Sequence, residues 1–179
     1  MTAQVQDTVV FNNTDFDMIG VNGEGLFTPE TIGMRPVMIH TACYRGFYLQ
    51  YELSQETGLL LQELTLRELK DNYVPVHGVV PERSVYQAAY HNLNLPVAFS
   101  GHMRLGADFI QDLYIHMGYQ KPSAYKTVLD ISLENGRLVE VKDRSEDAAA
   151  IRGGFKEKYH SGSAIEGIKN AFDLDMGFE

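Results

Sequence analysis

The strongest folding signal in the chain is a pair of apolar runs on either side of Asn135-Gly136. Both runs lie within residues 127–141 and are rich in Val, Leu and Ile, and Asn-Gly is the residue pair that most favours the tight turn of a β-hairpin. Apolar and polar residues alternate along the first run, so its apolar side chains share one face. The residues predicted to face the core are Leu129, Ile131 and Leu133.

A second hairpin is predicted over residues 47–66. Apolar and polar residues alternate along residues 47–53, which is typical of a strand with one buried face. Residues 54–58 (SQETG) then supply turn-forming residues, ending in Gly58 for a positive φ. The two hairpins resemble each other weakly, so an internal duplication stays open. The core residues predicted in this hairpin are Phe47, Leu49 and Tyr51.

Additional strands are predicted near residues 21–23 and 97–105, and the β segments recur at intervals of tens of residues. This spacing predicts a mainly β fold, an antiparallel β-barrel or β-sandwich of about eight or more strands with one or two short helices. An α+β fold is the alternative. A helix is predicted from Ser145 as N-cap to a break at Gly153-Gly154, another from Ser163 through Ala171, and a helical turn or two within residues 84–93. Residues 1–179 are predicted to form a single domain, because no linker composition divides them.

The charge balance argues against several classes of partner. With 15 basic and 24 acidic side chains the formal net charge is −9, whereas nucleic acids and anionic membranes are bound by clustered Lys and Arg. The chain has six His, but no two are spaced for joint ligation from one strand face or helix turn, and no glycine-rich phosphate loop is present. We therefore expect no nucleic-acid or membrane partner, no metal and no cofactor.

Localisation follows from the N-terminus and the cysteine count. The first residues (MTAQVQDTVVF) lack the basic and apolar regions of a signal peptide, and no apolar run approaches the length of a membrane span. A single cysteine excludes an intrachain disulfide and is consistent with a reducing compartment. The sequence predicts a cytoplasmic protein of undetermined oligomeric state.

Cys43 lies three residues after His40, which raises the question of a nucleophile activated by a base. Residues three apart on a strand point to opposite faces, so the pair meets only if the chain turns there. A lone cysteine also commonly behaves as a small buried hydrophobe. We predict that Cys43 is structural.

The predicted binding face combines aromatic and cationic side chains from three segments. His102 and Arg104 share one face if residues 100–105 form a strand, and together they suit an anion or carboxylate. The run YIHMGYQKPSAYK, residues 114–126, has the composition of a recognition loop. The predicted ligand-binding residues are Tyr44, Arg45, His102, Arg104, His116 and Tyr119.

One resemblance to known proteins rests on the segment from Thr41 to Phe47, in which Thr-Ala-Cys is followed by aromatic-Arg-Gly-aromatic. Together with FSGHMRLGADFI and HMGYQKPSAYK, this segment resembles a group of uncharacterised bacterial proteins. The resemblance runs from about residue 25 to residue 141. It implies no reaction, substrate or cofactor.

Three classes of function remain open from the sequence. The first is a binding or interaction module that takes a small anionic or polar ligand, or a protein partner, on the aromatic-cationic face. The second is an enzyme that uses His102 or His116 as general base and Arg104 or Arg45 to stabilise negative charge. The third is an immunity-type protein whose acidic surface neutralises a basic toxin.

Overall fold

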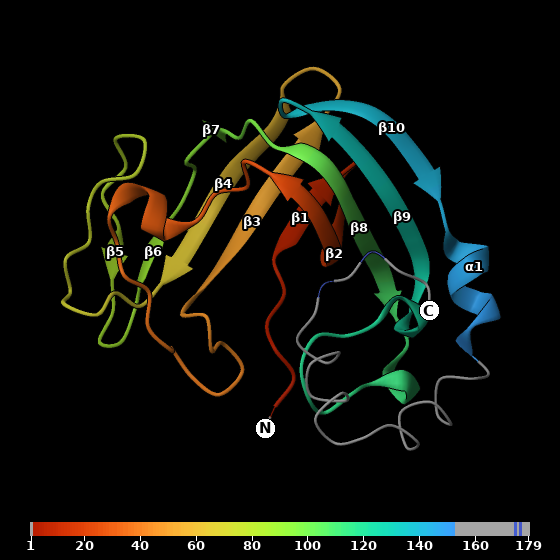
Figure 1. The fold of residues 1–179 in the computed structure, drawn as a ribbon. Helices are drawn as coiled ribbons and strands as arrows, with labels where there is room; N and C mark the ends of the chain where they lie inside the picture. Colours follow the sequence, from red (N-terminus) through yellow and green to blue (C-terminus); the bar gives the residue numbers. More distant parts are fainter. Residues whose placement is uncertain (1, 153–173, 175, 177–179) are drawn as a thin grey trace.

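The computed structural model describes residues 2–152, 174 and 176, and its strands belong to one curved sheet (Figure 1). The strand order is β10-β9-β8-β2-β1-β3-β4-β6-β5, with β7 paired to β4. The strands are β1 (Thr8–Phe11), β2 (Thr14–Glu24), β3 (Phe47–Ser54), β4 (Gly58–Leu66), β5 (Glu82–Arg83), β6 (Ala88–Tyr90), β7 (Leu95–Pro96), β8 (Ser100–Phe109), β9 (Tyr125–Glu134) and β10 (Arg137–Asp143). The helical elements are the 3₁₀ turns η1 (Pro29–Ile32), η2 (Gln111–Leu113) and η3 (Pro122–Ala124), and the α-helix α1 (Ser145–Ala150).

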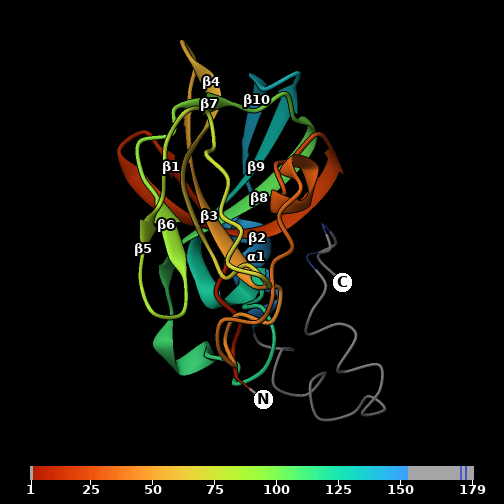
Figure 2. The ribbon, with the colours of Figure 1, turned by 90° about the vertical axis from the view of Figure 1, so that its left-hand side faces the viewer.

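The predicted mainly β class is confirmed, but two of its details are corrected. The sheet curls around an apolar interior without closing into a barrel, because β10 and β5 lie at its two ends and are not paired with each other (Figures 1 and 2). The sheet is also mixed, since β1 runs parallel to β3, with Thr8 opposite Gln50 and Phe11 opposite Leu53. Parallel neighbours need a long connection, and here β2 and residues 25–46 supply it.

Both predicted hairpins are present. β3 pairs antiparallel with β4, and β9 with β10. Asn135 and Gly136 have φ of 49° and 77°, the double positive φ of the turn that their sequence predicted. A third tight turn joins β1 to β2 through Asn12 and Asn13, which also both have positive φ.

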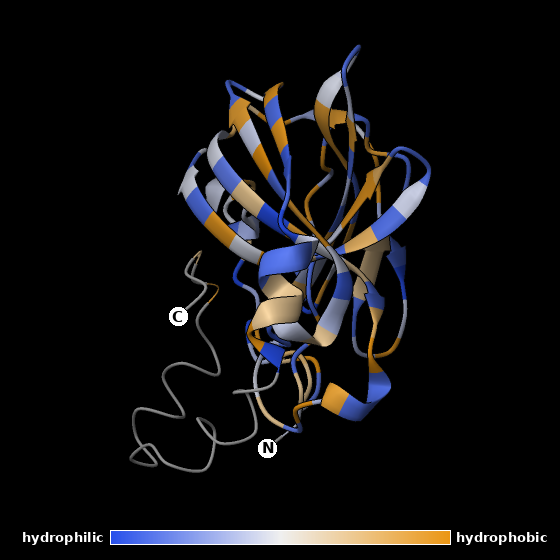
Figure 3. Cartoon of the chain, turned by 90° about the vertical axis from the view of Figure 1, so that its right-hand side faces the viewer, coloured by the Kyte–Doolittle hydropathy of each residue, from blue (hydrophilic) through white to orange (hydrophobic). Residues whose placement is uncertain are grey.

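The concave face of the sheet packs the main core. Alternate residues of the longer strands β2, β3, β8 and β9 reach it, and in Figure 3 polar and apolar residues alternate along the strands. Leu129 is only partly buried, whereas the other predicted core residues are at most 8% exposed. These buried residues are Phe47, Leu49, Tyr51, Ile131 and Leu133.

At one end of the sheet, the tips of the two hairpins meet the segment before β8. The Leu59 amide donates to the Gly136 carbonyl at 2.8 Å, and the Gly136 amide donates to the Phe99 carbonyl at 2.7 Å. A Cβ at Gly136 would lie 2.3 Å from the Val97 carbonyl oxygen, so only glycine fits between these backbones. This junction brings strands from opposite halves of the sheet together without closing it.

The convex face carries a second, smaller cluster beneath α1. Ala148 of α1 packs there with Ile19, Tyr125 and Val128. A helix is present where one was predicted, but the N-cap prediction is wrong, because Ser145 is the first helical residue and Arg144 is the N-cap. The Ser145 hydroxyl accepts a hydrogen bond from the Val128 amide.

The other helix predictions have different outcomes. The helical turn expected within residues 84–93 is wrong, because strand β6 forms there and pairs with β4. The break at Gly153-Gly154 and the helix from Ser163 through Ala171 lie outside the described residues. Within the described part of the chain, no helix has the length and apolar character needed to cross a membrane.

Candidate functional site

The structure divides the six predicted binding residues between two places. Tyr44, Arg45, His116 and Tyr119 lie in loops next to the N-terminal residues 3–7, at the end of the molecule where β1 and β3 begin. His102 and Arg104 lie on the convex face of β8. The single aromatic-cationic face expected from the sequence is therefore not assembled from all six residues.

The N-terminal residues hold the first group together. Ala3 forms a β-bridge with Gly118, and the Gln4 amide donates to the Gly118 carbonyl at 2.8 Å. The Gln4 side-chain oxygen accepts the Tyr44 amide at 3.0 Å. We call Tyr44, Arg45, Tyr114, His116 and Tyr119 the tyrosine end; the two loops that carry them lie beside the N-terminal residues, and the N-terminus is at the bottom of Figure 1.

Arg45 is the charged centre of the tyrosine end, and its charge is compensated. Its guanidinium forms a bidentate ion pair with Asp7, with Nη1 3.0 Å from Oδ2, and its Nε donates to the Phe47 carbonyl at 2.8 Å. The guanidinium carbon also lies 4.6 Å from the centroid of the Phe47 ring. Burial alone lowers the pKa of Arg45, but the Asp7 carboxylate outweighs it and raises that pKa.

Asp7 is a residue of this region that the sequence interpretation missed. It precedes Val9 and Phe11 by two and four residues, so it shares their core-facing side of β1, and it is only 6% exposed. Its Oδ1 also accepts the Leu49 amide at 2.7 Å. The signal was present in the alternation, because a carboxylate on a core face needs a cationic or donor partner.

Cys43 is buried within this end, and its thiol is not activated. It is 2% exposed and its Sγ donates to the Phe47 carbonyl at 3.4 Å. Burial raises the pKa of the thiol above its ordinary value, which is the opposite of what a thiolate nucleophile needs. His40 Nδ1 accepts a hydrogen bond from the Ala42 amide, so it caps the local turn. The arrangement agrees with a structural cysteine.

Two tyrosine side chains interact with the Asp7–Arg45 ion pair: Tyr51 is fully buried and Tyr119 is partly buried. Burial raises the pKa of Tyr119 and of the fully buried Tyr51, and the Asp7 charge acts in the same direction on both hydroxyls. Tyr51 reaches this region from the core face of β3, and within the described structure its hydroxyl has no hydrogen-bond partner. The interior next to the Asp7–Arg45 pair therefore favours neutral phenols.

The outer part of the tyrosine end is exposed. Tyr44 and Tyr114 are 43% and 44% exposed, and the Tyr114 ring packs edge-on against that of His116 with centroids 5.8 Å apart. Gln120 fixes this loop from within, since its side chain bonds both the amide and the carbonyl of Ile115. Tyr114 and His116 are thus presented on a loop that Gln120 holds, and Tyr44 on a second loop that Gln4 holds.

Arg104 and His102 share one face of β8 but contact different partners. It is 1% exposed and forks onto Asp130 of β9, with Nε–Oδ1 2.7 Å and Nη2–Oδ2 2.8 Å, and Arg144 approaches the same carboxylate at 3.1 Å. His102 shares the strand face as predicted, but it is exposed and its Nδ1 lies 3.0 Å from the Ser132 hydroxyl. The Arg104–Asp130–Arg144 group ties β8, β9 and the start of α1 together.

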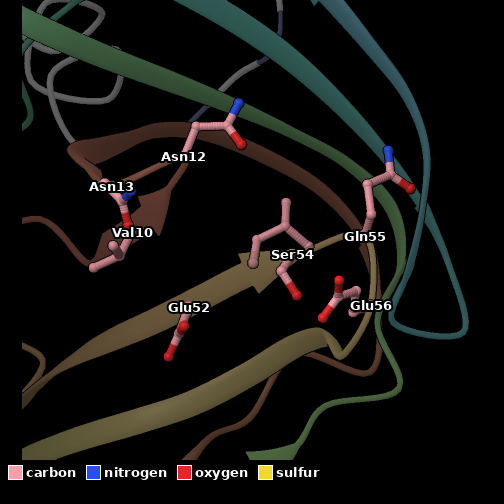
Figure 4. A pocket seen from close by; sticks show the side chains of 8 residues that line it. Val10, Asn12, Asn13, Glu52, Ser54, Gln55 and Glu56 are labelled. Carbon is pink, nitrogen blue, oxygen red and sulfur yellow. The ribbon is translucent and has the colours of Figure 1, made fainter.

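A polar hollow lies at the opposite ends of β1 and β3 from the tyrosine end (Figure 4). Its volume is about 330 Å³, and no sequence pattern pointed to it. Glu52 in its wall already accepts a hydrogen bond from Gln62 at 2.7 Å. The lining residues are Val10, Asn12, Asn13, Glu52, Leu53, Ser54, Gln55 and Glu56.

Among the residues that the structure describes, no group of three or more His, Cys, Asp or Glu side chains is arranged to hold a metal ion. Comparisons of the chain with protein-family models, with curated proteins and with solved structures found no match.

Proposed function

We propose that this protein is a binding module and that the tyrosine end contacts a protein partner. The observation that carries the proposal is the exposure of Tyr44, and of Tyr114 beside His116, on two loops that the N-terminal residues Ala3 and Gln4 contact. Tyrosine, histidine and arginine side chains on a fixed loop surface give large contact area at low entropic cost, which favours protein recognition.

The ion pairs favour a protein partner over a small anion. A small anion binds through cations whose charge is available, but Arg45 is paired with Asp7 and Arg104 with Asp130. An anion at either arginine would compete with a carboxylate already in bidentate contact. The same pairing counts against the enzyme alternative, in which these arginines stabilise developing negative charge.

The immunity-type alternative also requires a protein partner, so the same binding experiment would detect it. Its only support is the net charge of −9, and no contact at the tyrosine end favours it. We therefore retain only the general form, a protein-binding module.

Photocrosslinking at the tyrosine end tests the proposal. A photoreactive phenylalanine analogue replaces Tyr44 in the full chain, expressed in cells at natural abundance. The expected result is a discrete adduct whose yield falls several-fold when Tyr114→Ala is added, because both rings contact the partner. The matched control carries the analogue at Gln55, an exposed residue at the opposite end of β3.

Three outcomes would contradict the proposal: no adduct, an adduct insensitive to Tyr114→Ala, or the same adduct from Gln55.

A thermal-shift panel of anionic metabolites on the purified chain tests the small-ligand alternative. An anion that stabilises the wild type but not Tyr44→Ala would show that the tyrosine end binds a small ligand, and it would overturn the protein-partner proposal.

A further inference from the structure

The edge strand β10 carries apolar side chains that remain exposed. Within the described chain, β10 pairs with β9 on one side and no strand lies beyond it (Figure 1). Val139 and Val141 are 63% and 42% exposed. An edge strand presents outward-pointing backbone donors and acceptors, so apolar residues on such an edge favour pairing with another strand.

Register with β9 assigns each β10 side chain to a face. Val141 lies opposite Ile131 and so points to the concave side, while Glu140 and Lys142 lie opposite Ser132 and Asp130 on the convex side. A β-bulge between Leu138 and Glu140 breaks this alternation. Regular alternation therefore holds only from Glu140 to Asp143.

The face pattern selects one way for β10 to pair with a second copy of itself. In a two-fold antiparallel pair, facing residues must lie on the same side of the joined sheet, so the symmetry centre falls on a residue. A centre at Glu140 opposes two glutamates, and a centre at Lys142 opposes two lysines. A centre at Val141 opposes Val141 with Val141 and gives two Glu140–Lys142 pairs, which is the complementary register.

We propose that β10 is a homodimerisation edge and that two copies of this chain pair antiparallel through β10 about Val141. The two Glu140–Lys142 contacts lie on the convex face, and the two Val141 side chains meet on the concave face. The pairing extends one curved sheet across both copies and shields the exposed valines of both edges. It uses a surface separate from the tyrosine end, so each proposal stands or fails on its own.

Charge reversal tests the register. Lys142→Glu places four carboxylates across the two-fold axis, and Glu140→Lys places four ammonium groups there. We expect each single reversal to weaken the dimer about tenfold or more by sedimentation equilibrium, and the double variant Glu140→Lys/Lys142→Glu to restore it, because the pairs are re-formed with exchanged partners. The matched control is Lys126→Glu, the same change on an exposed residue of β9.

A thiol crosslink tests the centre directly. Directly opposed residues of an antiparallel pair have Cα atoms within disulfide reach, so Val141→Cys should give a covalent dimer under mild oxidation and Val139→Cys should not. The native thiol does not compete, because Cys43 is buried. Circular dichroism of each variant confirms that it is folded before its mass is measured.

Several results would overturn the proposal. They are a wild-type chain that is monomeric throughout the micromolar range, a dimer that Lys142→Glu does not weaken, and single reversals that the double variant fails to rescue. A dimer that crosslinks through Val139→Cys in preference to Val141→Cys also contradicts this register.

Discussion

At the scale of single residues, the most informative side chains are charged groups that are partly or fully shielded from water. Asp7 and Arg45 connect the start of β1 to the loop before β3, and Arg104 and Asp130 connect β8 to β9. Each carboxylate pairs with an arginine that the sequence suggested as a ligand-binding residue. Buried charges of this kind are stable only as pairs, so losing one partner costs more than losing both.

The Asp7–Arg45 pair gives the first prediction. Asp7→Ala leaves the Arg45 charge and the Leu49 amide without their acceptor, and we expect a loss of about 3 kcal/mol in the free energy of unfolding. Asp15→Ala, which removes an exposed carboxylate of β2, should change it by less than about 0.5 kcal/mol. Urea denaturation measures both. If Asp7→Leu/Arg45→Met is less stable than Asp7→Ala, the unpaired charge is not the cause.

Cys43 gives the second prediction. Burial raises the pKa of its thiol, so at neutral pH it carries less thiolate than a free cysteine does. A thiol reagent should therefore label the native protein slowly and the urea-unfolded protein fully. Cys43→Ala should lower the melting temperature modestly and leave the Tyr44 crosslink unchanged. Rapid labelling of the native chain contradicts this assignment.

At the scale of elements, local sequence patterns predicted the two hairpins, but they did not predict which distant strands pair. Asn135-Gly136 and the alternation of residues 47–53 are local, and the structure confirms both hairpins. The parallel pairing of β1 with β3 depends on packing between residues that are distant in the chain, and no local sequence pattern indicates it. The Asn12-Asn13 turn was readable but overlooked, because asparagine tolerates positive φ almost as glycine does.

The candidate site shows the same division. Parity correctly placed His102 and Arg104 on one strand face, but their partners come from β9, about thirty residues away along the chain. Composition marked residues 114–126 as a tyrosine-rich loop, but the loop ends at η3, and Tyr125 begins strand β9. The association of this loop with Tyr44 depends on the Gln4 and Gly118 contacts. The type of a side chain and the strand face it lies on are local properties, whereas which side chains come together in a site depends on distant segments.

The junction of hairpin tips gives the third prediction. Gly136 and Gly33 have φ of 77° and 80°, so alanine at either position carries the same left-handed strain, about 1 to 2 kcal/mol. A Cβ at Gly136 meets the Val97 carbonyl at 2.3 Å, whereas nothing lies within 4 Å of a Cβ at Gly33. Gly136→Ala should therefore destabilise the chain clearly more than Gly33→Ala in thermal or urea unfolding. Equal losses in the free energy of unfolding would show that the close approach of Gly136 to the Val97 carbonyl does not affect stability.

At the scale of the whole molecule, buried phenols from separate parts of the sheet couple its stability to alkaline pH. Burial raises the pKa of Tyr90 on β6 to about 12, and also raises the pKa of Tyr51 on β3 and of Tyr125 on β9. The Tyr90 hydroxyl donates to the Val74 carbonyl at 2.7 Å, which requires the protonated form. Folding of the entire sheet therefore retains protons that an unfolded chain releases near pH 10.

The sign of the pH dependence follows from this difference. Each raised pKa contributes stability that is fully present below the unfolded value, about 10 for tyrosine, and is lost as the pH rises toward the folded value. The free energy of unfolding should thus fall between pH 10 and the Tyr90 value of about 12. Tyr90→Phe should reduce this slope by up to about 1.4 kcal/mol per pH unit, the share of one proton. Between pH 6 and 8 the two proteins should show the same slope, because Tyr90 is protonated in both the folded and the unfolded state. Urea titrations at fixed pH measure both ranges, and a slope above pH 10 that Tyr90→Phe leaves unchanged would exclude this phenol as a source of the alkaline instability.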